Sequence, residues 1–364
     1  MEPETFKKLP LGGVNRRELM GLLAEQGASQ ATALLERQRP AIAPQGAEIA
    51  PDTAVLILGG SNGITRAIAL QLVLGERAKV ICVHYDSPRM QIGPHHIAAL
   101  TGAAEEVGVQ LWSFNADATK PQTVASVIGA IRPELRAVHL LNGIAAGTPK
   151  RHPQHGPTKV LDLDVAFDPV LQVPDFSHPE SIRRLGWVEV GVASENETKR
   201  TMQFMGTSSL LWAEALADAG LLQAGESVVA FCDYDFPADD PVYGMGPLAD
   251  AKQEQRRLLD QIRTRFGVRA VTVAYPAMAT TALGAIPGAL LAYGLSAQVL
   301  KERGEFRDLD ELARLTMDLW RAPLPDRSLR VDEPFQGCLD EVRSRLSGIR
   351  PEDVPGAFSQ LLVD

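Results

Sequence analysis

The segment VYGMGPLADAKQ, residues 242–253, contains two residue types that act together in proton transfer: Tyr243 and Lys252, with eight residues between them. A phenol can donate a hydrogen bond or a proton to an oxygen on which negative charge develops, and a nearby ammonium favours ionisation of the phenol. The ammonium can also bind a ribose hydroxyl. The alternative is a surface tyrosine next to an ordinary helix lysine.

The spacing between the two residues restricts how they can cooperate. On one continuous helix, nine residues rise about 13.5 Å, which is too far for a phenol and an ammonium to act together. However, Gly244, Gly246 and Pro247 follow the tyrosine. Proline favours the first turn of a helix, whereas glycine disfavours its interior. We therefore predict a helix that begins near Pro247, with Lys252 in its second turn and Tyr243 on a loop that folds back over the lysine.

A glycine-rich turn has the composition of a nucleotide-binding site. The segment LILGGSNGITRAIAL places several glycines between a short apolar run and a helical pattern. Such glycines let backbone N–H groups approach a pyrophosphate at the positive end of a helix. The pattern is not a strict GxGxxG, so a tight turn without a ligand is the alternative. The candidate cofactor-binding residues of this turn are Gly59, Gly60, Ser61, Asn62, Gly63 and Ile64.

Asp86 follows the next expected strand, in VHYD, and bears on which dinucleotide binds. A carboxylate at this position accepts hydrogen bonds from ribose hydroxyls and repels a 2′-phosphate. It therefore favours NADH over NADPH, although Arg89 lies close by in the sequence. An ordinary loop aspartate is the alternative.

Two further strand ends supply candidate cofactor-binding residues. Asp117 and Ala118 lie in NADA, after the third expected strand, where we expect contact with an adenine. Asn142, Gly143 and Ile144 lie in LLNGIAAG at the end of the fourth, where small residues would let a nicotinamide ribose lie against the backbone. Plain packing of small residues explains each of these last positions almost as well.

These turns require a particular scaffold. From residue 53 onward, short apolar runs alternate with helical patterns, which predicts an α/β fold with a doubly wound parallel sheet of the Rossmann type. We expect residues 1–50 to form a helical arm and linker, and residues 51–364 to form a single domain. Residues 148–192 are rich in Pro and His and lack a helical period, which predicts an insertion with a short hairpin.

Composition limits the partners and the compartment. A formal net charge of −9 argues against nucleic acid or an anionic membrane as the main partner. Residues 270–300 contain no charge, but glycines and prolines interrupt them, so we predict a strand, a loop and an apolar helix rather than a membrane span. The polar N-terminus does not resemble a signal peptide. Three scattered cysteines, Cys82, Cys232 and Cys338, indicate a reducing compartment and a cytoplasmic protein.

The histidines do not predict a metal site. His95 and His96 are adjacent, and two residues separate His152 from His155. Neither pair is accompanied by a cysteine or carboxylate cluster at a familiar zinc spacing. We interpret all four as solvated loop residues and expect no bound metal.

Several longer segments match a known family. They are GGSNGIT, NADA, GTPKR and MQFMGTSSLLWAEALADAGLL, and, most specifically, VAFCDYDFPADDPVYGMGPLADAK and TTALGAIPGALLAYGLSAQVLKERG. With these segments the chain, from about Val55 to its C-terminus, resembles the trans-2-enoyl-CoA and enoyl-ACP reductases. These are enlarged members of the short-chain dehydrogenase superfamily that carry a Tyr-x8-Lys pair.

The resemblance implies an activity and assigns residues to it. The expected reaction is NADH-dependent reduction of the carbon–carbon double bond of a trans-2-enoyl thioester, on CoA or an acyl carrier protein, by a monomer. Tyr243 would be the donor that stabilises the enolate, with Lys252 as its partner. An apolar lid at residues 278–303 would bind the acyl chain. Candidate substrate-binding residues are then Tyr234, Thr280 and Thr281.

The chain also departs from the family pattern. The N-terminal arm has nothing similar to the family's CTTAHPxGC-like stretch, FCDYD stands where members have YSY, and NGIAAG replaces SLASP. The last two changes flank the expected cofactor and substrate. They leave two alternatives open: an NAD(P)H-dependent reductase of a ketone or aldehyde, in which Tyr243 protonates an alkoxide, and a cofactor-binding scaffold without turnover.

Overall fold

The computed structural model describes residues 4–7, 14–43, 49–87, 89–175, 181–234, 239–321 and 328–349. Within these residues the fold is built on a seven-stranded, wholly parallel sheet of order β10-β9-β8-β5-β2-β3-β4. The strands are β2 (Thr53–Leu58), β3 (Lys79–His84), β4 (Leu111–Asn115), β5 (Ala137–Asn142), β8 (Val228–Tyr234), β9 (Arg269–Tyr275) and β10 (Ser328–Arg330). The predicted doubly wound sheet is confirmed.

The strand order indicates at which edge of the sheet a ligand would bind. From β2 the chain builds outward through β3 and β4, then returns to the other side of β2 with β5 and continues through β8 and β9. Adjacent connections therefore diverge between β2 and β5, where Leu58 pairs with Asn142. In open parallel sheets ligands bind outside the carboxyl ends of the strands at such a switch point. The candidate residues that follow β2, β3, β4 and β5 all lie at this edge.

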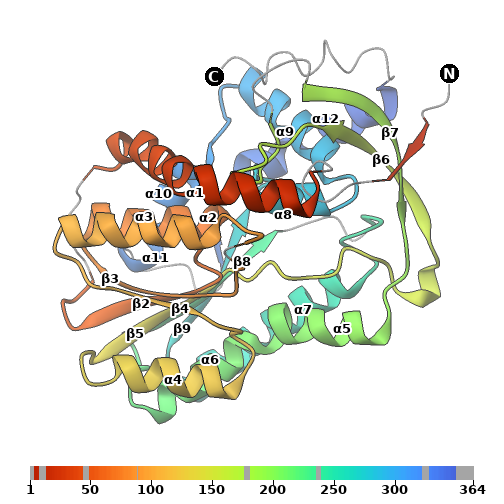
Figure 1. The fold of residues 1–364 in the computed structure, drawn as a ribbon. Helices are drawn as coiled ribbons and strands as arrows, with labels where there is room; N and C mark the ends of the chain where they lie inside the picture. The colour runs from red at the N-terminus through yellow and green to blue at the C-terminus, as the bar shows by residue number, and fades with distance from the viewer. Residues whose placement is uncertain are drawn as a thin grey trace.

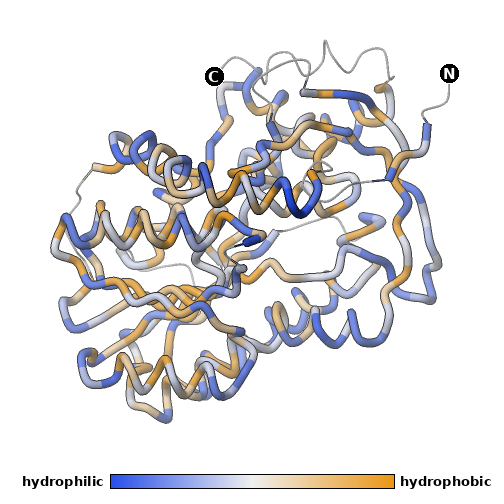
Figure 2. The backbone as a smooth tube through the Cα atoms, viewed as in Figure 1, coloured by the Kyte–Doolittle hydropathy of each residue, from blue (hydrophilic) through white to orange (hydrophobic). Residues whose placement is uncertain are grey.

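Helices cover both faces of the sheet (Figure 1). One apolar core joins the sheet to α2 (Gly63–Leu70), α3 (Gly93–Glu106) and α10 (Leu309–Thr316). A second core joins the opposite face to α4 (Pro121–Ile131), α6 (Ser208–Asp218) and α7 (Pro247–Phe266). Because both faces are covered, β2 and β5 are buried at every residue and read as continuous apolar runs, visible as hydrophobic strands in Figure 2.

The N-terminal segment packs against this domain. The predicted helix is α1 (Arg16–Gln38), which begins where the side chain of Asn15 accepts a hydrogen bond from the N–H of Glu18 at 3.0 Å. Its residues Leu19 and Leu23 are buried in one cluster with Ile92, beside the β3–α3 loop. A two-residue strand, β1 (Thr5–Phe6), was not predicted.

The predicted insertion contains the predicted hairpin. It is formed by β6 (Thr158–Val165) and β7 (Ile182–Val190), which pair antiparallel, and β1 adds to β7 in parallel to give a second, three-stranded sheet. The predicted lid segment forms two helices, α8 (Thr281–Ala285) and α9 (Ala289–Glu302). Helix α9 packs on β6 and on α12 (Glu333–Gly348), so hairpin, lid and C-terminal helix share one apolar core.

Shorter elements complete the chain. The long helical segment predicted after the hairpin is interrupted: α5 (Glu195–Thr201) passes through a π-helical turn into α6. The remaining elements are α11 (Asp318–Arg321), the 3₁₀ turns η2 (Arg39–Ala41) and η4 (Pro153–His155), and the π-helical turns η3 (Gln71–Glu76) and η6 (Met202–Thr207). In the described part of the chain, helices of membrane-spanning length and hydrophobicity are absent.

Candidate active site

The glycine turn has the strand–turn–helix geometry that nucleotide binding requires. Gly59 and Gly63 have φ of +83° and +56°, a region that favours glycine. The hydroxyl of Thr65 donates to the carbonyl of Gly59 at 2.6 Å, which closes the turn onto the first residues of α2. A Cβ on Gly59 would lie 3.2 Å from the carbonyl oxygen of Gly143, so the turn also packs on the end of β5. The turn therefore has the backbone shape that a pyrophosphate-binding turn needs, and its role toward a cofactor stays a prediction.

Asp86 is held by a histidine that sequence reasoning missed. The Nδ1 atom of His84, a buried residue at the end of β3, lies 2.9 Å from Oδ2 of Asp86, and its Nε2 lies 3.1 Å from the hydroxyl of Ser113. Because a carboxylate only accepts, Nδ1 carries the proton. A Cβ on Gly93 would lie 2.4 Å from the same Oδ2, so the start of α3 lies directly against the carboxylate. Asp86 thus has a fixed orientation before any ribose binds.

The structure corrects our interpretation of two histidines as solvated loop residues. His95 and His96 lie in the first turn of α3 rather than in a loop, and His96 is buried. Burial, with Arg66 nearby, lowers the pKa of His96 to about 4, so its imidazole is neutral. Its Nδ1 lies 3.1 Å from the carbonyl of Ser61, which ties α3 to the glycine turn. In the described residues, groups of three or more histidine, cysteine or acidic side chains placed to hold a metal are absent.

Asp117 borders a cleft of about 400 Å3. Its Oδ1 accepts hydrogen bonds from the N–H (2.9 Å) and the hydroxyl (2.7 Å) of Thr119, so the carboxylate shapes the β4–α4 turn, while the carbonyl of Ala118 accepts from Trp212 at 2.9 Å. Sequence reasoning missed the other walls, although an exposed tyrosine just before Asp86 was a usable signal. These walls include Tyr85, Lys120, Lys199, Arg200 and Phe204.

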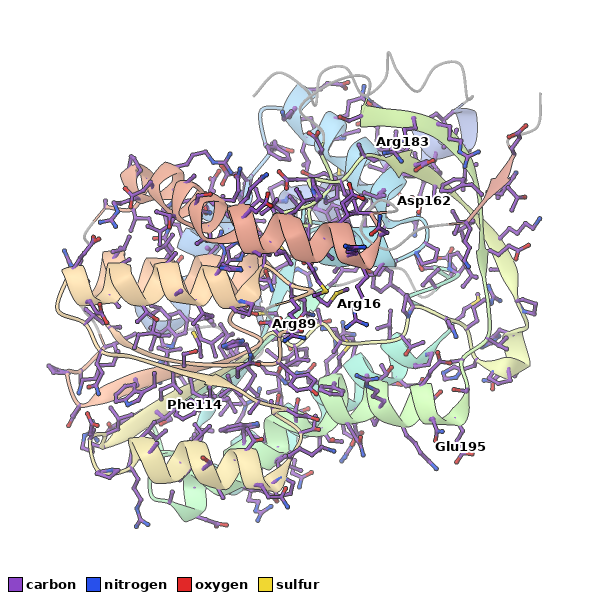
Figure 3. All side chains as sticks on the ribbon, viewed as in Figure 1. Arg16, Arg89, Phe114, Asp162, Arg183 and Glu195 are labelled. Atoms are coloured by element: carbon purple, nitrogen blue, oxygen red, sulfur yellow. The ribbon has the colours of Figure 1, made fainter. Side chains whose placement is uncertain are left out.

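The side chains around this region are exposed. Tyr85 is 66% exposed and presents an aromatic face to solvent beside the cleft. Arg89 is also exposed, and it is labelled in Figure 3. The positive charge that we noted beside Asp86 in the sequence therefore lies on the open side of the loop.

Asn142 and Gly143 hold the end of β5. The buried amide of Asn142 donates to the hydroxyls of Ser208 (2.8 Å) and Ser209 (2.9 Å), and its Oδ1 accepts from the N–H of Ile144 at 3.1 Å. A Cβ on Gly143 would lie 2.1 Å from Cγ2 of Thr65. These contacts bring the β5 end against the glycine turn, and their role toward a cofactor stays a prediction.

Tyr243 lies on the loop before α7, as the glycine and proline pattern predicted, and its placement over Lys252 stays a prediction. Helix α7 begins at Pro247, and Tyr243 is on the preceding loop. Asp240 shapes this loop, because its Oδ1 accepts from the N–H groups of Val242 (2.8 Å) and Tyr243 (2.6 Å). Burial raises the pKa of the Tyr243 phenol well above its ordinary value, and Tyr234 and Asp240 raise it further. The phenol is therefore protonated at neutral pH and able to donate.

Lys252 and Tyr243 both contact the carboxyl end of β8. The Nζ of Lys252 donates to the carbonyl of Cys232 at 2.7 Å and lies 3.4 Å from Oδ1 of Asp233. The ring of Tyr243 packs on Tyr234, with centroids 5.1 Å apart. Three consecutive strand residues, 232–234, therefore hold both candidate catalytic groups. Sequence reasoning missed Asp233 as a partner of the lysine.

The segment that we predicted to be a lid lies next to this end of the sheet. A Cβ on Gly63 would lie 3.3 Å from Cγ2 of Thr280, so the start of the lid touches the glycine turn, and Thr281 opens α8. Tyr234 packs on Phe335 of α12, with centroids 5.9 Å apart. Burial raises the pKa of the Tyr234 phenol.

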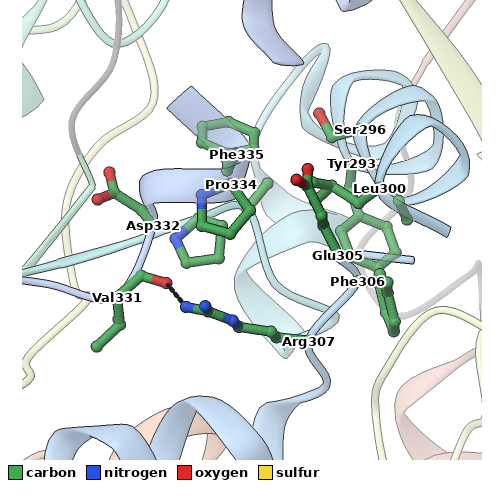
Figure 4. A pocket seen from close by; sticks show the side chains of 13 residues that line it. Tyr293, Ser296, Leu300, Glu305, Phe306, Arg307, Val331, Asp332, Pro334 and Phe335 are labelled. Atoms are coloured by element: carbon green, nitrogen blue, oxygen red, sulfur yellow. Dashed lines mark hydrogen bonds between the residues drawn. The ribbon is translucent and has the colours of Figure 1, made fainter. Parts of the chain in front are cut away.

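A small cavity lies between α9 and the C-terminal segment (Figure 4). Its volume is about 20 Å3. Beside it Arg307 donates to the carbonyl of Val331 at 3.2 Å. A cavity of ~10–15 Å3 holds one water, so this space is too small for an acyl chain. Other residues that line it are Pro276, Tyr293, Phe306, Asp332 and Phe335.

Known proteins resemble this chain over most of its length. The NADH enoyl-acyl-carrier-protein reductase of Colwellia psychrerythraea is 25% identical over 308 residues, which cover 81% of this chain and 77% of that protein. The trans-2-enoyl-CoA reductase of Euglena gracilis is 27% identical over 318 residues, 82% of this chain. The chain spans 58% of the Euglena protein.

Solved structures share the fold. The trans-2-enoyl-CoA reductase of Clostridium acetobutulicum in complex with NAD has a TM-score of 0.72 at 20% identity, covering 92% of this chain and 89% of that one. A short-chain dehydrogenase from Burkholderia cenocepacia J2315 in complex with NADP has a TM-score of 0.53 at 17% identity, covering 79% and 98%. The fold is therefore of the short-chain dehydrogenase class.

The family follows from a more specific match. The model of the trans-2-enoyl-CoA reductase catalytic region matches residues 91–319, more than half of the chain. The chain belongs to this enoyl reductase family, as its motifs indicated.

Proposed function

We propose that this protein is an oxidoreductase that uses NADH to reduce the carbon–carbon double bond of a trans-2-enoyl thioester. The observation that carries the proposal is the carboxyl end of β8, where a buried, protonated phenol and an ammonium are held by consecutive residues. The named activities of the family's relatives, on CoA and acyl-carrier-protein substrates with NADH, support it.

The residues at the switch point fit a dinucleotide. At Gly59 the positive φ and the close approach of Gly143 leave room only for backbone, which suits a pyrophosphate. Asp86, fixed by His84, is placed to accept from a ribose and to disfavour a 2′-phosphate. The cleft beside Asp117 has a volume that suits the adenosine end. NADH rather than NADPH is the expected cofactor.

The protein's own groups would act on the thioester oxygen. When bound, the reduced nicotinamide supplies hydride to Cβ of the enoyl group. Negative charge then develops on the thioester oxygen, and Tyr243 donates a hydrogen bond that stabilises the enolate. Lys252 places a positive charge at the same strand end, which favours this charge build-up. Packing on Tyr234 and the contact of its N–H with Asp240 keep the phenol in place.

The acyl chain would bind under the lid. The cavity next to α9 has a volume of about 20 Å3, whereas drug-sized ligands occupy roughly 300–1,000 Å3. We propose that the acyl chain binds when α8 and α9 move away from the sheet, with Thr280 and Thr281 at the edge of the opening. We further propose a monomeric cytoplasmic enzyme whose N-terminal residues 1–50 form an arm on a single catalytic domain.

One assay tests the function. NADH oxidation is followed with a crotonyl thioester, with a β-keto thioester and without substrate. The proposal expects turnover of the crotonyl compound, and turnover of the keto compound alone would reassign the protein as a carbonyl reductase. NADH binding without turnover of either compound would instead indicate a cofactor-binding scaffold.

A further inference from the structure

Three charged groups form a connected set at the carboxyl end of β8. The side chain of Asp233 is 1% exposed. Its Oδ2 accepts a hydrogen bond from Nε of Arg256 at 2.8 Å and lies 2.6 Å from Nη2 in an ion pair. Its Oδ1 accepts from the N–H of Tyr234 at 2.9 Å and lies 3.4 Å from Nζ of Lys252. Both carboxylate oxygens are therefore engaged, and the arginine is the nearer cation.

The helix places both cations at the same carboxylate. Lys252 and Arg256 are four residues apart on α7, so both side chains lie on the face that covers β8. A buried carboxylate without a counter-ion is strongly unfavourable, and it attracts whichever cation is within reach. A charge-assisted hydrogen bond and an ion-pair contact from Arg256 satisfy Oδ2 of Asp233. The lysine consequently stays at 3.4 Å, beyond a good hydrogen-bond distance.

This arrangement leaves the ammonium of Lys252 available. Its short contact is with the carbonyl of Cys232, at 2.7 Å. An ammonium has three N–H donors, and those directed at Cys232 and Asp233 account for two. The positive charge, which also lies 5.4 Å from the centroid of the Phe231 ring, remains for a bound group. The side chain of Lys252 is 12% exposed, so a ligand can reach it from the cleft side only over a small area.

We propose that Arg256 is a positioning residue for the reduction, because it occupies the carboxylate of Asp233 and so leaves Lys252 its positive charge for Tyr243 and the reacting oxygen. This inference rests on the proposed function. The three groups carry one net positive charge. Without Arg256, the carboxylate closes on Lys252 and the net charge falls to zero. Without both Asp233 and Arg256, the net charge is again one, supplied by the lysine alone.

Other titratable groups surround the set, and the test leaves them unchanged. Tyr234 and Asp240 face Tyr243, and both raise the pKa of its phenol. Cys232 faces Lys252 from β8, and Asp332 faces Tyr234 from the segment before α12. Because these groups stay in place, a difference between variants reports the pairing of Asp233.

The experiment measures kcat at saturating NADH and crotonyl thioester in a set of matched variants. Arg256→Gln is expected to lower kcat about tenfold or more, since the lysine charge is lost to Asp233. The double variant Asp233→Asn/Arg256→Gln is expected to recover to within about threefold of wild type. Arg256→Lys keeps a cation and most of kcat. The control is Arg257→Gln, because Arg257 is exposed on the same helix and pairs with Glu254.

A crystal structure of Arg256→Gln supplies a readout that does not need turnover. It is expected to show Nζ of Lys252 within about 2.8 Å of Oδ1 of Asp233, the distance of a charge-assisted hydrogen bond. Should the lysine stay on Cys232, or should kcat of Arg256→Gln equal that of wild type, the inference is overturned. A double variant as slow as Arg256→Gln overturns it too.

A different result would disprove the proposed function. If wild-type protein does not reduce the crotonyl thioester, the function is wrong, and the position of Lys252 in the Arg256→Gln crystal still decides the pairing. If Asp233→Asn does not fold, Arg256→Gln against Arg256→Lys decides the kinetic part, because Arg256 is about half exposed and tolerates substitution.

Discussion

The two parts of the proposed site, a nucleotide side and a catalytic side, are built in different ways. The nucleotide side consists of turns that directly follow β2, β3 and β4, and each is closed by contacts within a few residues, such as those of Thr65 with Gly59 and of Thr119 with Asp117. The catalytic side joins the end of β8, the loop before α7, the lid and the C-terminal helix. There Tyr234 packs on Phe335, far away in the chain.

The difference extends to how each side is held. On the nucleotide side, His84 and Ser113 fix Asp86 through hydrogen bonds between neighbouring strands of one sheet. On the catalytic side, Asp162 of the hairpin accepts from the N–H of Leu291, at the start of the lid helix, at 3.3 Å. The nucleotide side is therefore part of the rigid scaffold, whereas the catalytic side depends on the docking of several segments. Substitutions should separate cofactor binding from turnover.

The largest expected effect is a loss of turnover without a loss of cofactor binding. Tyr243→Phe removes the donor to the reacting oxygen but keeps the ring that packs on Tyr234. We expect kcat to fall by about 10²–10⁴-fold, the range of a lost general acid. The dissociation constant of NADH, measured by fluorescence titration, should stay within about twofold of wild type. Full activity in this variant would remove Tyr243 from the mechanism.

A substitution on the nucleotide side should have the opposite signature. A Cβ on Gly143 would lie 2.1 Å from Cγ2 of Thr65, so Gly143→Ala pushes the β5 end away from the glycine turn. We expect roughly tenfold weaker NADH binding and a loss of about 1–3 kcal/mol in the free energy of unfolding, as for other overpacked sites. Gly191→Ala is the control, because its Cβ meets no atom within 4 Å. Unchanged binding in Gly143→Ala would separate this contact from the cofactor site.

The preference for NADH over NADPH tests the nucleotide side with a smaller expected effect. Asp86→Ala removes the carboxylate that is held by His84. NADH binding should weaken by about tenfold, the loss of one or two hydrogen bonds to a charged group, while NADPH binding changes less or improves. Isothermal titration with both dinucleotides measures the ratio. An unaltered ratio would show that Asp86 does not contact the ribose.

The last expected effect is a pH dependence of stability that leaves the proposed catalytic groups untouched. Burial lowers the pKa of His96 and of His139 to about 4, below the ordinary value of 6.5. The unfolded chain therefore takes up protons below pH 6.5 that the folded protein binds only near pH 4, and stability falls as the pH drops through this window. The loss is on the order of 2 kcal/mol for each histidine.

Urea unfolding between pH 7 and 4 measures this loss. His96→Gln should flatten the dependence, because glutamine does not titrate. An equally steep fall in the variant would assign the dependence to other groups.

Sequence patterns predicted the parts of the fold that repeat a strong local signal. Apolar runs such as Thr53–Leu58 and the proline at position 247 set strand and helix starts correctly. The two-residue β1 and the three-residue β10 were missed, since so few residues carry no periodicity. Their formation depends on an available sheet edge.

The residues of the candidate site were likewise predictable only where they lie beside a strong local signal. The glycine turn, Asp86 and the loop that carries Tyr243 were found because each lies beside a recognisable strand or helix end. The pairing of Asp233 with Arg256 was missed, because it depends on which face of α7 covers β8. A basic residue four positions after Lys252, together with an acid at the end of the preceding strand, was the available signal. His84 left no signal, since histidine at a strand end has many roles.

The short strand β1 has a consequence for the order of synthesis. Thr5 and Phe6 pair with Trp187 and Val188, which leave the ribosome much later. Until then these two residues have no sheet to join, whereas β2, β3 and β4 already have one another. Thr5 and Phe6 are thus among the last residues to pack against the folded protein. A bulky protein fused just before β1 would lie beside the hairpin rather than beside the main sheet.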